Sequence, residues 1–599
     1  MTEDQADQIP EVDEQTTPED MKSNASKSAQ KDSSEPKSQD KKPKSANKFA
    51  RLWQAYVAKK KLTFPLTIIV LIIVILAVPT SRYPLIGTFM KQNISLSVVD
   101  SQTGNPISSA AIVLNGVRIN TDNHGQATLK TKIGYVLMTI NKKYYQTYSQ
   151  KILVPIKRPK QALELKLIAT GRQVPLFVTD KITNDGLENV TIAASGTEVK
   201  TEKDGTVTIV LPANQKQVSA ILSADGYNQA HVSIQVTDHP VTQNQFKLVP
   251  TGKIYFLSKL SGNIDVVKTD LDGSNRQTVL AGTGNEEDTG TILLASRDWK
   301  YLALISRRNG TQTKVYLIDT ASDKLTTIDG GSATFSAVGW SDDRFIYTAD
   351  STNTQYWQSG RSVLKSYDAT TNQLTSLDQT TAEGVNATDY AYESFGQTYI
   401  LDNTVLYTKN WNAYYTSGNR LNDKQAKIIS VRPDGSNLST LKTFGVPSGT
   451  NTSSIYIESR PYQAQSIYFK FTVTTASYFT YENGQIKDNT SLTDDSYYNN
   501  AYPTYLVSPS DKQTFWSEER DGKNTLFIGD ITGNNGKQIA SLSDYTPYGW
   551  FTDKYLLVSK SSSELYIMST SNNATAYKVS DYHKPNYDFH GYGYGYGGL

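Results

Sequence analysis

Val315-Tyr316-Leu317-Ile318-Asp319 is the clearest copy of a short element that decides the fold: an apolar strand that ends at an aspartate in a turn. Copies ending at Asp270 and Asp368 place the three aspartates 49 residues apart. Later copies end less regularly, at Asp434, Glu482, Asp530 and Ser569. A repeat of about 40–50 residues with four strands per unit is typical of propeller blades. We count about seven units on this basis, with six or eight as alternatives.

A second element, a tight turn that enters an apolar strand, precedes most units. Its copies are Ser296–Ala303, Trp340–Ile346 and Ser508–Phe515. Together the two elements resemble the TolB-type β-propeller, whose blades read Trp-Ser-Pro-Asp-Gly-Lys followed by Asp-x-Asp-Gly-Ser. We assign residues 251–582 to this propeller. The resemblance implies a fold and leaves the function open, because propellers host many activities.

A different repeat lies upstream of the propeller. The alternating strand Ile94–Val98 leads into a turn at Asp100, and a hairpin follows at Gly125. The same order returns 80 residues later at Asp180 and Gly205. Since each copy has room for about seven short strands, the shared offset predicts two tandem β-sandwiches. The predicted copies are residues 93–168 and 171–250.

These copies carry a resemblance of their own. Thr103–Ile107, Ala111–Val113 and Thr121-Asp122-x-x-Gly125 resemble the carboxypeptidase regulatory-like domain, a transthyretin-type sandwich, and the related PEGA-type surface module. The second copy adds the family's late Gly-Tyr at Gly226-Tyr227, but it departs from the pattern at Asn184–Leu187. The resemblance implies a structural and binding accessory without catalytic residues.

An uncharged apolar run, Leu62–Val78, comes before both repeats. A helix of about 20 such residues spans a bilayer, and the lysine-rich flank before it predicts a cytoplasmic N-terminus. We expect a signal-anchor helix within residues 51–82, with Trp53 and Tyr56 at the interface. A cleaved signal peptide is the alternative, but its charged leader is normally far shorter than the segment found here. The expected location is the plasma membrane, crossed once, with the C-terminal region extracytoplasmic.

The two ends of the chain are polar or rich in glycine. Residues 1–50 hold few large apolar side chains, which predicts a disordered cytoplasmic tail. This tail either binds a partner or only sets the topology. Residues 583–599 are rich in glycine and tyrosine, and Asn586–Phe589 is a candidate strand for closing the propeller. The overall expectation is an all-β extracytoplasmic region behind one N-terminal transmembrane helix.

The composition and motifs of the chain argue against several classes of catalytic and metal chemistry. The chain has no cysteine and a net charge of +2, which excludes thiol catalysis and gives no sign of a nucleic-acid partner. The five histidines fall in separate segments, and the Asp-Gly turns are too short for EF-hand loops, so we expect no metal and no cofactor. Neither a Gly-x-Ser-x-Gly elbow nor a downstream α/β domain is present. A carbohydrate-active enzyme with carboxylates on different blades stays open as an alternative.

The candidate binding residues lie in long aromatic segments of the propeller. Asp350–Ser362 holds Tyr356 and Trp357, and the link Asp378–Tyr392 opens on the same face. The segment Trp411–Lys424 adds the remaining candidates, Trp411, Tyr414 and Tyr415. Exposed tyrosine and tryptophan suit both protein hot spots and sugar stacking. The alternative is that the rings pack on their own loops.

We therefore expect a membrane-anchored binding or scaffold protein whose propeller recognises an envelope or surface protein or a glycan. A surface sensor coupled to the cytoplasmic tail is a further alternative. Trp340 and Trp550 enter blade strands, and for them the sequence predicts core positions.

Overall fold

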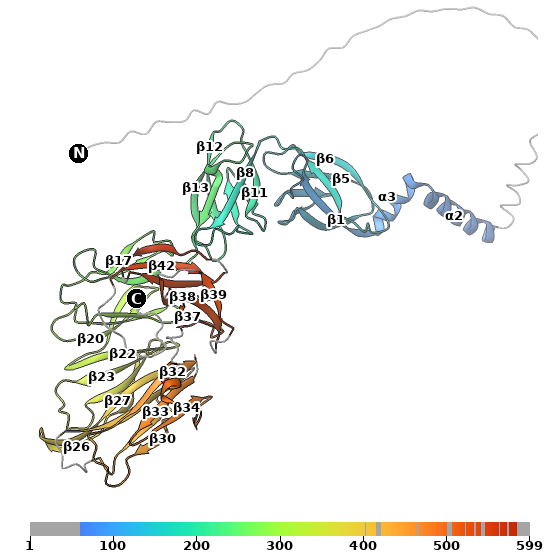
Figure 1. Cartoon of the computed structure of the whole chain (residues 1–599). Coiled ribbons are helices and arrows are strands. Elements are labelled where there is room, and N and C mark those ends of the chain that lie inside the picture. The colour runs from blue at the N-terminus through green and yellow to red at the C-terminus, as the bar shows by residue number, and fades with distance from the viewer. Residues whose placement is uncertain are drawn as a thin grey trace, which may run out of the picture. The chain divides into compact units, whose positions relative to one another are not determined.

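The computed structural model describes residues 60–401, 403–414, 421–463, 466–499, 506–520, 523–531, 535–540, 545–561, 563–571 and 574–583. The chain divides into two compact units, Met1–Ile86 and Gly87–Leu599. The predicted tail, residues 1–50, lies outside the described residues. Helix α2 covers Lys60–Ala77, and α3 covers Pro79–Phe89 (Figure 1). Across the described ranges, no helix combines the length and apolar character needed to cross a membrane.

Two small β-domains come first in the second unit, and each has two antiparallel-rich sheets around one core. In the first domain, one sheet has three strands in the order β4 (Gln126–Lys132), β1 (Lys91–Asp100), β7 (Leu163–Leu167). The other has four strands in the order β3 (Val117–Asn120), β2 (Ala111–Leu114), β5 (Gly134–Asn141), β6 (Tyr148–Val154). In the second domain, the three-stranded sheet has the order β11 (Thr206–Leu211), β8 (Arg172–Asp180), β14 (Gln245–Leu248). Its four-stranded sheet has the order β10 (Thr197–Lys200), β9 (Thr191–Ala194), β12 (Gln217–Ser223), β13 (Ala230–Gln235). The two domains thus share one strand order.

Equivalent aspartates accept equivalent backbone hydrogen bonds in the two domains. Asp100 Oδ1 accepts the Thr103 N–H at 2.9 Å, and Asp180 Oδ1 accepts the Thr183 N–H at 2.9 Å. Each carboxylate thereby caps the turn after the first strand of its domain. Strand β1 alternates buried and partly exposed side chains after Asn93, as expected of a strand with one face on a core.

Seven sheets follow along the chain from Ile254 to Asp581 in the described residues. The first is β15 (Ile254–Ser258), β16 (Asp265–Thr269), β17 (Gln277–Leu280); the second β18 (Ile292–Ala295), β19 (Tyr301–Ser306), β20 (Lys314–Asp319), β21 (Lys324–Asp329). The third is β22 (Ala333–Ser341), β23 (Arg344–Ser351), β24 (Ser362–Asp368), β25 (Gln373–Gln379). The fourth is β26 (Ala382–Asn386), β27 (Asp389–Leu401), β28 (Thr404–Tyr414), β29 (Gln425–Val431), β30 (Ser439–Gly445), with β31 (Ser454–Ile455) paired to β28.

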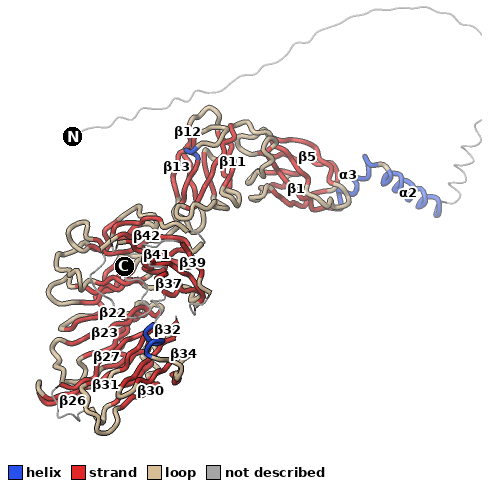
Figure 2. Tube along the Cα trace, in the orientation of Figure 1, coloured by secondary structure: helices blue, strands red, loops and turns tan. Residues whose placement is uncertain are grey.

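The last three sheets have four strands each. The fifth is β32 (Ile457–Gln463), β33 (Ser466–Thr472), β34 (Ala476–Glu482), β35 (Gln485–Asp488), followed by helix α4 (Asp494–Asn499). The sixth is β36 (Leu506–Val507), β37 (Gln513–Arg520), β38 (Lys523–Asp530), β39 (Lys537–Ala540). The seventh is β40 (Tyr545–Thr552), β41 (Tyr555–Lys560), β42 (Glu564–Ser569), β43 (Tyr577–Asp581). Figure 2 shows how completely strands dominate the chain after α3.

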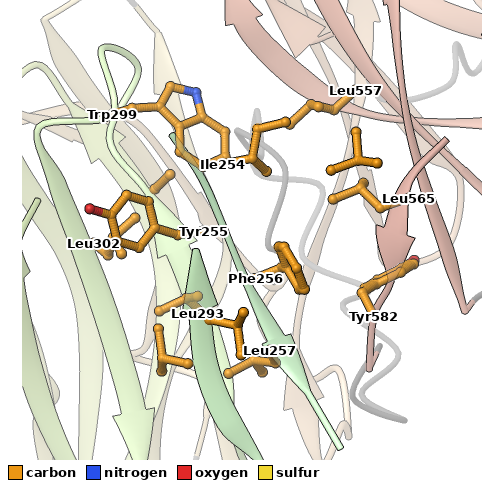
Figure 3. Close-up of a cluster of buried hydrophobic side chains, with 14 of the residues drawn as sticks. Ile254, Tyr255, Phe256, Leu257, Leu293, Trp299, Leu302, Leu557, Leu565 and Tyr582 are labelled. Atoms are coloured by element: carbon orange, nitrogen blue, oxygen red, sulfur yellow. The ribbon is translucent and has the colours of Figure 1, made fainter. Parts of the chain in front are cut away.

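Shared cores join each sheet to the next and close the ring. One core combines side chains of the first and second sheets with Leu557 and Leu565 of the seventh (Figure 3). Trp299 Nε1 donates to the Trp550 carbonyl at 3.0 Å, so the second sheet is bonded to the seventh. Trp340, with no exposed surface, donates from Nε1 to the Leu294 carbonyl at 3.0 Å. The seven sheets therefore form a β-propeller.

Two predictions about individual positions in the propeller are confirmed. Trp340 and Trp550 are buried in it, at 0% and 5% exposure. The weakly marked unit at Glu482 is a complete sheet, since β34 ends there in a tight hairpin.

The first sheet has three strands, and the end of the described chain reaches its open edge. His583 donates its backbone N–H to the Leu257 carbonyl on β15 at 2.9 Å, beside the buried ring of Tyr582. The predicted closing strand, Asn586–Phe589, lies outside the described residues.

Candidate functional site

An aromatic cluster lies where the third and fourth sheets meet. Its members are Tyr356 and Trp357 from the β23–β24 loop, Tyr390 and Tyr392 from β27, and Tyr414 from β28. The Tyr356 and Tyr392 ring centroids are 5.2 Å apart, and those of Trp357 and Tyr390 are 5.8 Å apart. Tyr390 also stacks on Tyr414 at 5.4 Å. Segments distant in sequence thus contribute rings to one surface.

The hairpin β27–β28 supplies the platform for this cluster. Tyr390 pairs directly with Tyr414, and Tyr392 pairs with Asn412. Because side chains two residues apart on a strand share a face, Tyr390, Tyr392 and Ser394 form one row. Asn412 Nδ2 donates to Ser394 Oγ at 3.0 Å and so ties the two strands together on this face.

The β23–β24 loop is held in place by Arg361. Its guanidinium lies 4.0 Å from the centroid of the Tyr356 ring, a cation–π arrangement. Arg361 Nη1 also donates to the Ser351 carbonyl at 2.7 Å and to the Thr354 carbonyl at 3.1 Å. The loop is therefore cross-braced at its base, and Tyr356 keeps 44% of its surface exposed.

A buried polar network fixes the link from the third sheet to β27. Glu393, only 4% exposed, accepts the Thr381 N–H at 2.9 Å and pairs with Lys409 at 3.0 Å. Tyr407 donates to Asp378 at 2.7 Å. Burial, followed by this hydrogen bond, raises the pKa of Tyr407, so its phenol stays protonated as a donor. Because neighbouring side chains alternate along a strand, Glu393 and the Tyr392 ring lie on opposite faces of β27.

The structure corrects one part of the predicted face. The sequence predicts a loop from Trp411, but β28 continues to Tyr414. Trp411 is 6% exposed and packs in the core that joins the fourth, fifth and sixth sheets, with the Lys424 ammonium 5.3 Å from its ring. Tyr414, three positions further along β28 and on its opposite face, is 43% exposed. Tyr415 lies outside the described residues.

A pocket of about 320 Å³ opens at the base of the cluster. Asp350 and Ser362, the two ends of the loop that carries Tyr356, line it. On the other wall Ser394 and Gln397 come from β27, where a bulge between Phe395 and Thr398 breaks the register. Bulges near a site redirect side chains, and the residues of this bulge line the pocket. We call this cavity the Asp350 pocket.

The Asp350 pocket is lined mainly by hydroxyl, amide and carboxylate groups. Its polar side chains are those of Ser336, Thr348, Asp350, Ser362, Ser394, Gln397 and Thr398. No lysine or arginine is among the described residues that line it. Within the described ranges, the side chains of Thr348, Asp350 and Gln397 have no hydrogen bond to another residue. These polar atoms are therefore available to a ligand.

The pocket also limits the chemistry that the site supports. Glycoside hydrolysis commonly uses a pair of carboxylates about 5–10 Å apart. Among the described residues that line the pocket, Asp350 is the only carboxylate. Across the described ranges, no group of three or more histidine, aspartate and glutamate residues is arranged to hold a metal ion. Burial raises the pKa of Tyr390 and Tyr392, so both rings are neutral at physiological pH.

Tyr390, Tyr392 and Asp350 were not among the predicted site residues. The link Asp378–Tyr392 had been expected on this face, but its two tyrosines were not singled out. Their spacing of two residues was the available signal, because it places both rings on one side of a strand. Asp350 lies near the end of β23, and nothing in the sequence marks it as different from the many aspartates at strand ends.

Comparison with known proteins assigns no family. No protein-family model matches the sequence, and no curated protein matches it. Solved structures with similar regions include a prolyl endopeptidase (12% identity, TM-score 0.25, 70% of this chain and 54% of that chain). They also include TolB from Acinetobacter baumannii (13%, 0.23, 58% and 78%) and the propeller domain of the trilobed protease from Pyrococcus furiosus (10%, 0.27, 50% and 98%).

The chain spans about half the length of that prolyl endopeptidase. Similarities at this level carry no conclusion about activity. The seven sheets and their shared cores define the propeller.

Proposed function

We propose that this protein is a membrane-anchored, extracytoplasmic binding or scaffold protein, with its propeller as the binding head. The aromatic cluster is the observation that carries the proposal. Tyr356 and Tyr414 are each more than 40% exposed although they belong to a braced group of five rings. Exposed rings on a rigid platform bind partners at a low cost in conformational entropy. The target class is an envelope or surface protein or a glycan.

The remaining parts of the proposal come from the sequence. The apolar run Leu62–Val78 and its basic flank support a single anchor in the plasma membrane with the N-terminus inside. The motif resemblances support a TolB-type propeller behind two regulatory-like or PEGA-type domains. In this arrangement the two domains act as a spacer between the anchor and the binding head.

Affinity capture from an envelope extract tests the proposed function. The full-length chain is immobilised in detergent micelles, and captured material is compared with that of the Tyr356→Ala and Tyr414→Ala variants. We expect the variants to lose the captured partner while keeping the melting temperature of the parent. Tyr135→Ala, a change of a 67% exposed tyrosine in the first β-domain, is the matched control. Capture that survives both cluster substitutions refutes the proposal.

A further inference from the structure

The aromatic cluster and the Asp350 pocket are two parts of one surface. The loop between β23 and β24 carries Tyr356 at its middle and ends at Asp350 and Ser362 in the pocket. Strand β27 likewise places Tyr392 in the cluster and Ser394 in the pocket wall. The β23–β24 loop with its flanking residues and strand β27 thus each contribute an aromatic ring to the cluster and a polar side chain to the pocket.

We propose that this surface is a carbohydrate site that takes the end of an uncharged glycan chain. The proposal rests on the proposed function and names the ligand class of the same site. The C–H faces of a sugar ring are apolar and stack on aromatic faces, whereas its hydroxyl groups point outward from the ring edge. The exposed rings of Tyr356 and Tyr414 offer the stacking surface, and Ser394, on the same face of β27 as Tyr392, adds a hydroxyl group in the pocket wall. One terminal sugar enters the pocket and the following sugars lie along the cluster.

The lining of the pocket selects against other ligand classes. An ionised carboxylate accepts hydrogen bonds only, so Asp350 suits two neighbouring sugar hydroxyls as donors. Thr348, Ser336 and Gln397 can both donate and accept. The Asp350 carboxylate disfavours phosphate, sulfate and uronate groups, and no lysine or arginine lines the pocket among the described residues to offset it. A protein hot spot would need an apolar recess for its anchor side chain, and this recess is polar.

The size of the pocket agrees with a small terminal group. Sites for small ligands have volumes of about 300–1,000 Å³. The Asp350 pocket, at about 320 Å³, lies at the lower end. It therefore holds the end of a chain, while the rest of the chain contacts the exposed rings of Tyr356 and Tyr414.

Direct binding to defined sugars tests the inference. The full-length chain in detergent micelles is titrated with cellohexaose, maltohexaose, mannohexaose and chitohexaose, and with heparin and polygalacturonate as anionic counterparts. We expect at least one neutral hexasaccharide to bind and neither polyanion to bind. Asp350→Ala should weaken binding about tenfold or more, since charge-assisted hydrogen bonds are lost. Tyr356→Ala should weaken it about threefold to tenfold.

Matched controls separate binding from folding. Asp495→Ala removes an exposed carboxylate from α4, and Tyr135→Ala removes an exposed ring from the first β-domain. Both should bind sugar like the parent. Asp350→Asn keeps the shape and should bind with intermediate affinity. Because Asp350 is partly exposed and unbonded among the described residues, none of its variants should shift the melting temperature by more than a degree or two.

The outcomes also separate this inference from the proposed function. Failure of every neutral hexasaccharide, equal binding of the polyanions, or parental affinity in Asp350→Ala overturns the inference. In the capture experiment, periodate treatment of the extract destroys vicinal diols and should abolish capture, whereas protease treatment should not. Capture that depends on Tyr356 but is lost only on protease treatment leaves the proposed function in place and refutes the glycan class.

Discussion

Gly396 is the position at which a single methyl group should disturb the candidate site most. It lies in the bulge of β27 and lines the Asp350 pocket. A β-carbon at this residue would lie 2.9 Å from Asn410 Nδ2, and closer still to Thr408 Oγ1, whereas ordinary contact begins at 3.4 Å. Thr408 has no exposed surface and is β-branched, so its hydroxyl has little freedom to rotate away. Gly396→Ala must therefore shift the strand.

The expected cost of this overpacking is about 1–3 kcal/mol in the free energy of unfolding. For a domain of this size that corresponds to a fall of roughly 2–6 °C in melting temperature, measured by differential scanning calorimetry. Thr408→Ala should cost about 1 kcal/mol or less, because it removes one methyl group and a buried hydroxyl with no partner among the described residues.

The double variant tests whether a steric clash with the Thr408 hydroxyl causes the loss of stability in Gly396→Ala. In Gly396→Ala with Thr408→Ala the new methyl group occupies the space that the threonine hydroxyl leaves. The double variant should therefore melt within about 2 °C of Thr408→Ala alone, which is a favourable coupling of roughly 1–2 kcal/mol. A double variant as unstable as the sum of the single changes would refute the steric reasoning. So would a Gly396→Ala protein that melts like the parent.

Three further predictions concern two tryptophan and tyrosine positions, the end of the propeller and the membrane topology. Trp411→Ala should cost about 3–5 kcal/mol and Tyr356→Ala less than about 1 kcal/mol in chemical unfolding, because the first ring is buried and the second is exposed; equal effects would contradict their placement. Deleting residues 583–599 should lower the melting temperature of the propeller, because the deletion removes the His583 N–H bond to β15; an unchanged value would show that the segment plays no part in closure. Protease added to intact spheroplasts should degrade residues 93–599 and spare an N-terminal tag, and protection of the C-terminal part would refute the predicted topology.

The blade repeat was predictable because each unit carries its own local signal. An apolar strand followed by an aspartate turn depends on residues adjacent in sequence, as at Asp319 and Asp368. Asp434 Oδ1 accepts the Ser436 N–H at 2.8 Å, a bond made within the turn itself. The membrane anchor stays a prediction, since it depends on the apolar run and its charged flank.

The candidate site was predictable only in part. The sequence placed long aromatic segments on one face of neighbouring blades, and the structure brings Tyr356, Trp357 and Tyr414 together with Tyr390 and Tyr392. It could not distinguish Trp411 from Tyr414. The two residues lie three positions apart on one strand and therefore on opposite faces, one toward a core and one toward solvent.

The sequence alone determined the kind of elements that form: strand-and-turn units repeated about seven times, two shorter β-repeats before them and the apolar run near the N-terminus. These depend on backbone preferences and hydrophobic periodicity over a few neighbouring residues. Tertiary structure alone decided which rings are exposed and that Asp350 opens into a pocket. Both depend on the pairing of Tyr390 with Tyr414 and on the bulge after Phe395, which set the direction of every side chain along β27. A shift of one residue in this register would turn the aromatic row to the other face, and no local pattern encodes that choice.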